Sequence, residues 1–336
     1  MNKDNDQFKP LSFNDDNELK SLSLNDDKEE LKPLSFDNES LEPLSFKSDL
    51  NTDTQNKNFD DEFVPIAKAN SNEIRNKDSN FVFFFGTAKS GKSVILATML
   101  YYMRSQAGVI RPKTGTPNTK EAEALLYDYF DNIRQGVLPE GTIRDKVTRL
   151  DLVFEPNNKS KKTLPINLTF LETSGENHDE IRRGGGYHSS IDSYLTANLP
   201  LTFIIVTSFE SAHKDDVLIN TFLDKLERYE KNLKSVNIIL IVSKWDKSGS
   251  TDVTSSIELD SFINERLPMT SQRIDTYGLS KTFYTIGELD ENTNRVTLLN
   301  LSTAEVLSKW LYQSIAGYPL DYEGTFWERI KFSFTN

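Results

Sequence analysis

Cysteine is absent from this chain, and only 3 of its 336 residues are histidine. Disulfide frameworks, thiolate metal sites and cysteine nucleophiles are therefore excluded, and a histidine-rich metal site is nearly excluded. Long apolar runs are missing too, since stretches such as Phe81–Phe85 and Ile238–Val242 are far shorter than a bilayer span. The first residues lack the basic and apolar regions of a signal peptide. We expect a cytoplasmic protein without a transmembrane segment.

Basic residues are outnumbered, because 39 Lys and Arg face 51 Asp and Glu, which gives a net charge of −12. A phosphate backbone is held by clustered Lys and Arg, so this balance argues against a nucleic-acid partner. The acidity is uneven. Residues 1–80 hold 10 basic and 19 acidic residues, a net charge of −9, which leaves −3 for residues 81–336.

The acidic first quarter contains four copies of one hexapeptide, [FL]-[KE]-[PS]-L-S-[FL], separated by spacers rich in Asn, Asp and Glu. The copies are Phe8–Phe13, Leu19–Leu24, Leu31–Phe36 and Leu41–Phe46. They are too short, acidic and proline-interrupted to stack as a solenoid, so we expect residues 1–79 to form a disordered acidic arm. The alternative is a low-complexity tail without a partner. The recurring Leu and Phe favour weak anchors that bind a protein partner together through avidity.

From Asn80 onward, apolar runs alternate with amphipathic stretches, which indicates an α/β domain over residues 80–318. Phe81–Phe85 is apolar at every position, as expected of a strand that is covered on both faces. A glycine-containing loop follows, and then Val94–Gln106, which reads as a helix. Residues 319–336 form an aromatic C-terminal tail.

Further elements complete the predicted fold. Arg149–Phe154 and Ile166–Leu171 read as a hairpin that adds an antiparallel edge strand to the sheet. The expected fold class is a P-loop NTPase three-layer sandwich with a mostly parallel sheet. Other predicted helices and strands are Thr119–Arg134, Leu201–Val206, His213–Asn232, Val236–Val242, Thr282–Ile286 and a last helix from Ser302.

The loop after the first strand matches the pattern G-x-x-x-x-G-K-[ST], a phosphate-binding loop. Its residues are Gly86, Thr87, Ala88, Lys89, Ser90, Gly91, Lys92 and Ser93. The glycines let successive backbone N–H groups point at a phosphate chain, and the following helix adds its positive dipole end. Lys92 is expected to reach the β- and γ-phosphates, and the Ser93 hydroxyl to ligate Mg²⁺. Nucleotide binding follows from this motif in its strand–loop–helix context.

Two further strand ends carry polar signatures. Glu172-Thr-Ser-Gly175 ends the second hairpin strand, and Ser243-Lys-Trp-Asp246 ends the strand Val236–Val242. With the phosphate loop, they make the chain resemble the P-loop GTPases of the translation-factor and Ras-like class. Signatures of this class are the phosphate loop, a switch-one threonine, D-x-x-G and N-K-x-D. The resemblance implies GTP and GDP as ligands, Mg²⁺ as cofactor and GTP hydrolysis as the activity.

The resemblance also implies a role for individual residues at the phosphates. Thr142 is similar in position to the switch-one threonine that completes Mg²⁺ coordination, with Thr116, Thr119 and Thr148 as competitors. Glu172 stands where the class has the Asp that holds the Mg²⁺ shell, and Gly175 where a backbone N–H meets the γ-phosphate.

At the base, the resemblance implies that Asp246 accepts hydrogen bonds from guanine and that Lys244 lies along its ring. Ser243 stands in for the usual Asn. Thr285-Ile286-Gly287 follows the last predicted strand, and we expect Gly287 to belong to the final base-contacting loop.

Departures from the class lower the expected rate of turnover. Glu172 replaces Asp and is one methylene longer. Glu176 occupies the place of the Gln that orients the attacking water, near a γ-phosphate of the same sign. We therefore expect slow hydrolysis with Lys92, Thr142 and Glu176 as catalytic residues. Arg182 and Arg183, before Gly184–Gly186, either stabilise transition-state charge or form an incidental basic pair.

More narrowly, the chain is similar to the bacterial double-GTPase families of conflict systems, which implies a companion GTPase or effector protein as partner. Two alternatives remain open. A P-loop ATPase or kinase would use the same loop without base selection by Asp246, and a pseudo-GTPase scaffold would bind nucleotide without turnover.

The remaining polar residues receive no catalytic role at this stage. We expect His178, His188 and His213 to be surface or capping residues. Asp215 and Asp216 are expected to open a helix, where negative charge suits the helix dipole.

Overall fold

The computed structural model describes a single α/β unit and leaves both ends of the chain aside. The repeats of the acidic arm, the residues Arg183–Gly186 and most of the aromatic tail lie outside the described residues. The described residues are 78–142, 147–158, 163–182, 189–197, 199–229, 231–249, 256–290, 292–293 and 295–322.

A seven-stranded sheet forms the centre of this unit, in the order β2-β3-β4-β1-β5-β6-β7. Parallel pairing joins β4 to β1, β1 to β5, β5 to β6 and β6 to β7, whereas β3 is antiparallel to both β2 and β4. The strands are β1 (Asn80–Phe85), β2 (Gly108–Pro112), β3 (Val147–Pro156), β4 (Ile166–Thr173), β5 (Leu201–Ser208), β6 (Asn237–Ser243) and β7 (Ser280–Tyr284).

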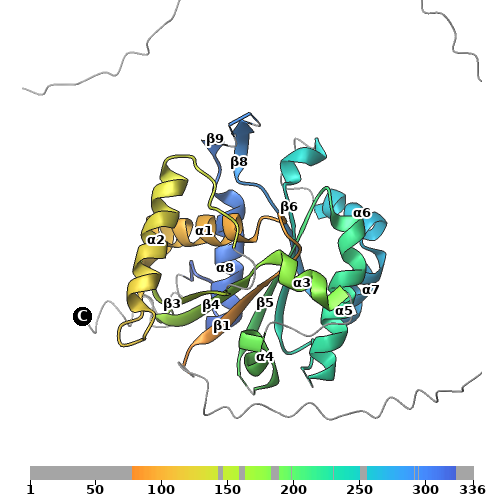
Figure 1. The fold of residues 1–336 in the computed structure, drawn as a ribbon, viewed down its shortest axis with the longest axis horizontal. Helices are drawn as coiled ribbons and strands as arrows, with labels where there is room; N and C mark the ends of the chain where they lie inside the picture. Colours follow the sequence, from red (N-terminus) through yellow and green to blue (C-terminus); the bar gives the residue numbers. More distant parts are fainter. Residues whose placement is uncertain are drawn as a thin grey trace, which may run out of the picture. The chain divides into compact units, whose positions relative to one another are not determined.

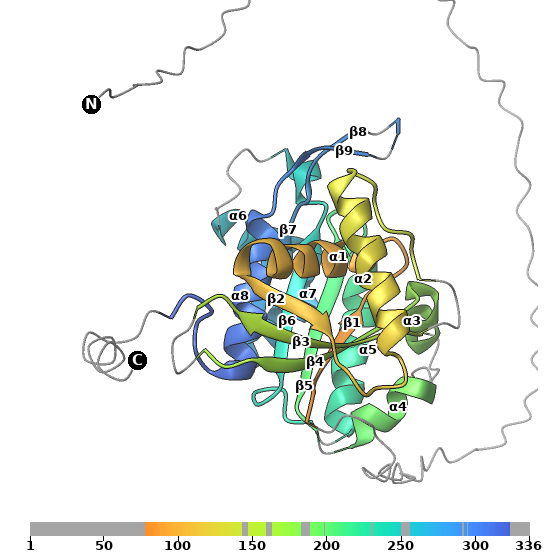
Figure 2. The same ribbon diagram turned by 90° about the vertical axis from the view of Figure 1, so that its left-hand side faces the viewer.

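Helices cover both faces of the sheet, which confirms the predicted three-layer α/β class (Figures 1 and 2). One face carries α1 (Lys92–Tyr102), α2 (Thr119–Arg134) and α8 (Ser302–Ala316). The other face carries α3 (Gly175–Arg182), α4 (Ser189–Thr196), α5 (Ala212–Arg228), α6 (Ser256–Arg266) and α7 (Pro268–Tyr277).

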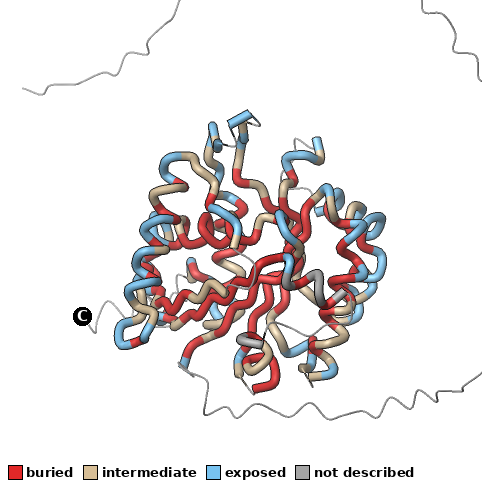
Figure 3. Tube along the Cα trace, in the orientation of Figure 1, coloured by how far each residue is buried: buried red, intermediate tan, exposed pale blue. Residues whose placement is uncertain are grey.

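The strand β1 is apolar from Phe81 to Phe85 because both of its faces are buried. Val82 and Phe84 point into the core beneath α1 and α8, while Phe81, Phe83 and Phe85 point into the core beneath α5. In Figure 3 the central strands of the seven-stranded sheet are mostly buried, and the exposed residues lie on the outer surfaces of the helices, in the loops and in the hairpin at one end. The helix α2 has the predicted bounds, and β1, β5 and β6 lie where the apolar runs place them.

The antiparallel strand of the sheet is not at the edge, which corrects the predicted position of the hairpin. The chain leaves α1 through a π-helical turn, η2 (Met103–Ala107), and then forms β2, which pairs outside β3. A Cβ at Gly108 would lie 2.2 Å from the carbonyl oxygen of Glu155, so glycine is needed where β2 begins. This five-residue strand was not predicted from the sequence.

A second, two-stranded sheet was not predicted. It consists of β8 (Gly287–Asp290) and β9 (Arg295–Leu299), and it projects from one end of the domain in Figures 1 and 2. Among the described residues, no helix is long and apolar enough to cross a membrane.

Candidate functional site

The loop between β1 and α1 is folded tightly against its neighbours. Gly86 has a φ of 152°, and a Cβ there would lie 2.1 Å from the carbonyl oxygen of Val206 in β5. Gly91 is the N-cap of α1 with a left-handed φ of 94°, and no side chain caps the first turn. A helix N-terminus that no side chain caps is the arrangement found in phosphate sites.

Lys92 is folded back over the same loop. Its Nζ atom donates to the carbonyl oxygens of Gly86, at 2.8 Å, and Thr87, at 2.9 Å. Both acceptors belong to the loop that would surround a phosphate chain. The ammonium group is thus held against the loop by two backbone carbonyl groups.

Ser93 and Glu172 meet beside this lysine, as a shared Mg²⁺ site requires. The Ser93 hydroxyl donates to Oε1 of Glu172 at 2.6 Å, and the Glu172 side chain is 1% exposed. Within the described part of the chain, Oε2 of Glu172 has no hydrogen-bond partner. Burial raises the pKa of this carboxyl group, while the Ser93 hydrogen bond and the Lys92 charge lower it.

This pair fits a divalent cation of the magnesium class. A buried carboxylate oxygen without a partner, next to a hydroxyl, is the oxygen ligand set that Mg²⁺ prefers. Among the described residues, no group of three or more His, Cys, Asp or Glu side chains is placed so that it could hold a metal ion. Such a cation would therefore depend on hydroxyl, phosphate and water oxygens for its other ligands.

The structure separates the four candidate threonines. The Thr142 hydroxyl lies close enough to Glu172 to lower its pKa, and Thr148 is directly opposite Glu172 in the β3–β4 ladder. Thr116 and Thr119 instead donate to the carbonyl oxygen of Lys113, at 3.3 and 2.9 Å. Thr142 and Thr148 are thus the two candidates at the carboxylate.

Gly175, at the start of α3, lies against the phosphate loop. A Cβ at this position would be 2.0 Å from the amide nitrogen of Ala88, so only glycine permits the contact. The next residue, Glu176, is exposed, and its amide donates to the Ser174 hydroxyl at 3.3 Å. The predicted water-orienting residue therefore follows directly the glycine that touches the loop.

His178 corrects the prediction of a surface or capping role. It is 6% exposed, its ring centroid is 4.5 Å from that of Phe85, and its Nε2 lies 2.6 Å from the Thr173 hydroxyl. Its Nδ1 lies 3.1 Å from the amide nitrogen and 2.8 Å from the carbonyl oxygen of Gly86. Burial and the nearby Lys92 charge lower its pKa to about 3, so the imidazole is neutral.

The predicted base motif is joined to the phosphate loop. Ser243 ends β6, and its hydroxyl donates to the carbonyl oxygen of Ser90 at 2.6 Å. Lys244 follows with a left-handed φ of 54°, and its Nζ lies 3.1 Å from Oε2 of Glu210. Glu210 also pairs with Lys247 at 2.8 Å, so one carboxylate braces two lysines of the motif.

A cavity of about 750 Å³ opens beside this motif. Asp246 and Thr285 belong to its lining, and the Thr285 hydroxyl donates to Oδ1 of Asp246 at 3.4 Å. The cavity also reaches Gly91 of the phosphate loop, Leu138 and Gly287. Residues from four segments of the chain therefore surround one space large enough for a nucleoside.

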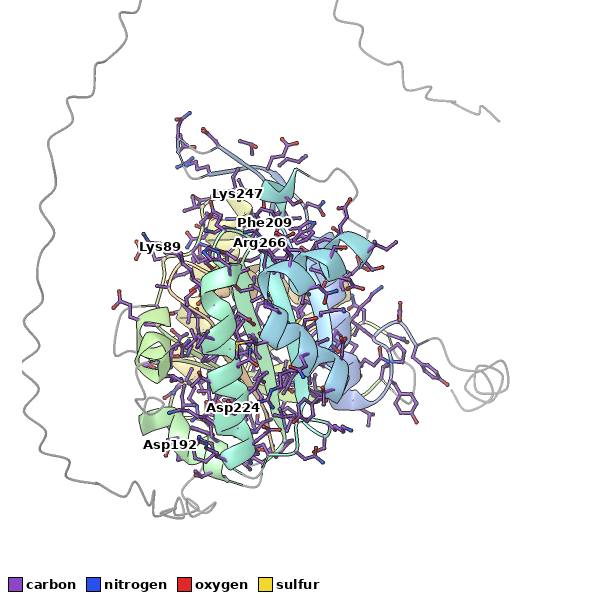
Figure 4. All side chains as sticks on the ribbon, turned by 90° about the vertical axis from the view of Figure 1, so that its right-hand side faces the viewer. Lys89, Asp192, Phe209, Asp224, Lys247 and Arg266 are labelled. Atoms are coloured by element: carbon purple, nitrogen blue, oxygen red, sulfur yellow. The ribbon has the colours of Figure 1, made fainter. Side chains whose placement is uncertain are left out.

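Aromatic packing holds the base motif in place. Trp245 is buried between Phe283, with ring centroids 5.5 Å apart, and Phe209, at 5.7 Å. Figure 4 shows Phe209, Lys89 of the phosphate loop and Lys247 toward the same end of the domain. This is the end at which the carboxyl ends of parallel strands in an α/β sheet form ligand sites.

Three contributors to the site were missed from the sequence: His178, Glu210 and Asp215. Glu210 and Asp215 follow the end of β5. Their position after a central strand is the one sequence feature that could have identified them, because ligand sites form at the carboxyl ends of such strands. Asp215 is buried and accepts a hydrogen bond from the Thr87 hydroxyl at 3.2 Å. No local pattern around His178 indicates that this residue is buried.

No protein-family model matches this chain, and no curated protein matches it. Solved structures do match. One is the signal recognition particle receptor SRb-GTP/SRX complex from Chaetomium thermophilum, with 12% identity, coverage of 70% of this chain and 98% of that chain, and a TM-score of 0.40. Another is a probable GTP-binding protein, engB, with 14% identity, coverage of 71% and 100%, and a TM-score of 0.33. Both are similarities of fold alone.

Proposed function

We propose that this chain binds GTP and GDP with Mg²⁺ and acts as a slow GTP-hydrolysing switch. The observation that carries this proposal is the 2.6 Å hydrogen bond from Ser243 to Ser90. It joins the base motif to the phosphate loop, so that one cavity extends from Gly91 to Asp246. A nucleotide bound here would have its phosphates at the loop and its base at the Asp246 carboxylate.

The chemistry of Asp246 favours guanine over adenine. An ionised carboxylate only accepts hydrogen bonds. Guanine presents two donors on one edge, N1–H and the 2-amino group, whereas the N1 of adenine is itself an acceptor. Adenine at this position would therefore place two acceptors against each other, which leaves both without a partner.

Ser93, Glu172 and Thr142 are the residues that would hold Mg²⁺. When bound, the cation neutralises charge on the phosphate oxygens. Lys92 adds a second positive charge, and its two carbonyl hydrogen bonds fix its position. Glu176 is a poor water-orienting group because its carboxylate repels the γ-phosphate, so we infer slow hydrolysis.

A pseudo-GTPase scaffold is a second candidate, and the carboxylates of Glu172 and Glu176 favour it, since both depart from the GTPase pattern. We further propose that the hexapeptide repeats recruit a protein partner, such as a companion GTPase or effector, in the cytoplasm. Neither function requires nucleic acid.

Competition binding followed by phosphate release tests the nucleotide proposal. Labelled GTP should be displaced from the full chain by unlabelled GTP and GDP at far lower concentrations than by ATP. Slow release of phosphate from GTP in Mg²⁺ would support the hydrolase, and tight binding without release would support the scaffold. Equal displacement by ATP would contradict base selection.

Replacement of Asp246 by Asn tests whether this residue provides the selectivity for guanine. The amide presents a donor where xanthine has a 2-carbonyl, so Asp246→Asn should weaken GTP binding by about tenfold or more and favour xanthosine triphosphate. Asp275→Asn is the matched control, because Asp275 is exposed on α7 and does not line the cavity. Unchanged selectivity in Asp246→Asn would place the base elsewhere.

A further inference from the structure

Asp215 has no role in the function proposed above, yet its carboxylate is bound to the phosphate loop. The residue lies in the first turn of α5 and is 3% exposed. A buried carboxylate is costly unless it is well hydrogen-bonded, so its partners indicate what it does.

Three hydroxyl groups donate to the same carboxylate oxygen, Oδ2. They come from Thr87 at 3.2 Å, Thr207 at 2.8 Å and Ser211 at 2.8 Å. Thr207 belongs to β5, Ser211 precedes α5 and Thr87 belongs to the phosphate loop. Asp215 therefore ties the loop to the end of the central strand next to β1.

Thr87 connects Asp215 to Lys92, the lysine that we expect to bind the phosphates. Its side chain donates to Asp215, while its carbonyl oxygen accepts from Nζ of Lys92 at 2.9 Å and from the amide of Ser90 at 3.3 Å. A change in the position of Thr87 would thus move both a turn of the loop and the ammonium group.

We propose that Asp215 is a positioning residue that holds the phosphate loop in its anion-binding shape before the nucleotide arrives. This inference rests on the proposed nucleotide binding for its functional consequence. The bond that matters joins the Asp215 carboxylate to the Thr87 hydroxyl. Because hydrogen bonds to charged groups are the stronger ones, its loss should be measurable in both the loop and the affinity.

Asp216 provides a matched control in the adjacent position. It is 5% exposed and bound by the amides of Met269 and Thr270, at 3.0 and 2.9 Å, so it caps α7. Asp216→Asn removes the same charge from the same helical turn without touching the loop. It should lower the thermal stability and leave nucleotide affinity within about twofold of the wild type.

The test compares Thr87→Val, Thr87→Ser, Asp215→Asn and Asp216→Asn in the full chain. Amide hydrogen exchange is measured in nucleotide-free protein, and affinity is measured with labelled GDP. Thr87→Val and Asp215→Asn should each speed exchange in residues 86–91 and weaken GDP by about tenfold. Thr87→Ser keeps the hydroxyl, so it should recover most of the loop protection and GDP affinity that Thr87→Val loses. The double variant Thr87→Val with Asp215→Asn should be no weaker than either single variant.

Loop exchange in Thr87→Val equal to that of the wild type would overturn the proposal, as would independent effects that multiply in the double variant. The exchange measurement needs no ligand. If the wild type binds no guanine nucleotide, the proposed function fails while the role of Asp215 in the loop is still decided. If Asp215→Asn does not fold, Thr87→Val decides, because it retains the carboxylate and its other two hydroxyl donors.

Discussion

His178 shows how one side chain can link the segment after β4 to the phosphate loop. Its two ring nitrogens contact Thr173 at the end of β4 and Gly86 at the start of the loop. A neutral imidazole carries one proton, so it donates on one side and accepts on the other. When Nδ1 holds the proton, Gly86 is contacted through its carbonyl oxygen, and when Nε2 holds it, Gly86 is contacted through its amide.

Burial of this imidazole predicts a pH dependence of stability. The pKa of His178 is lowered from 6.5 to about 3 in the folded protein, so between these values the unfolded chain binds one more proton. The free energy of unfolding should therefore lose about 1.4 kcal/mol per pH unit from this group as the pH falls below its unfolded pKa. Above that pKa, the contribution is fully present.

Denaturant titrations between about pH 7 and pH 4 measure this effect, with His178→Asn as the comparison. The Asn side chain does not titrate, so the stability of the variant should fall less steeply with acidification. The raised pKa of Glu172 acts in the opposite direction, but it is present in both proteins. Parallel stability curves would show that His178 is not held neutral.

Among the elements, the hairpin β8–β9 connects two sides of the proposed nucleotide cavity. Gly287 and Leu289 of β8 line the cavity, and the amide of Val296 in β9 donates to the carbonyl oxygen of Gly136 at 2.8 Å. Gly136 lies between α2 and Leu138, which lines the opposite side. The hairpin therefore joins the loop at Gly287 to the segment that leads to Thr142.

Separation of these two segments should speed nucleotide release. Gly136 has a left-handed φ of 69°, and a Cβ there would lie 2.6 Å from the carbonyl oxygen of Val296. Gly136→Ala should displace the hairpin and raise the dissociation rate of labelled GDP several-fold. Gly115→Ala is the control, because Gly115 has a similar φ of 79° but open space around it. Equal dissociation rates in the two variants would argue against a closing role for the hairpin.

At the scale of the whole molecule, most of the net negative charge lies in the N-terminal arm, and the proposed nucleotide site lies in the α/β domain. The arm has a net charge of −9 and the four hexapeptides, whereas every residue of the proposed nucleotide site lies in residues 81–336. Nucleotide binding and partner recruitment should therefore be separable by deletion.

Deletion of residues 1–60 should leave GDP affinity within about twofold of the full chain and reduce the retention of a partner. The last two apolar residues of each hexapeptide are then replaced by Ala cumulatively: Leu11 and Phe13, Leu22 and Leu24, Leu34 and Phe36, Leu44 and Phe46. Retention should fall stepwise, because every lost copy reduces avidity. The measurement is co-purification from the native cell, in which full-length protein is compared with the cumulative variants. Complete loss of partner retention after replacement of a single copy would indicate one true binding site. If the deletion variant retains the same proteins as the full-length chain, the recruitment hypothesis is wrong.

Several features of this protein are determined by the sequence alone, because they depend on residues that are close together along the chain. The phosphate loop needs Gly86, Gly91 and Lys92 at fixed spacing between a buried strand and a helix, and helical periodicity is enough to place α2. The apolar composition of Phe81–Phe85 likewise requires a strand that is covered on both faces. The neutral state of His178 could not be predicted from neighbouring residues. The sequence around it is typical of a surface loop, so burial of the ring was not expected.

The tertiary structure decided what depends on contacts between distant segments. His178 meets a residue 92 positions away, Thr87 meets Asp215 across 128 positions and Ser243 meets Ser90 across 153. The strand β2 and the hairpin β8–β9 are short and are placed by their pairing partners rather than by their own pattern. Local sequence can specify which groups carry the chemistry, but burial and hydrogen bonding between distant segments set which of these groups face one another and in which protonation state.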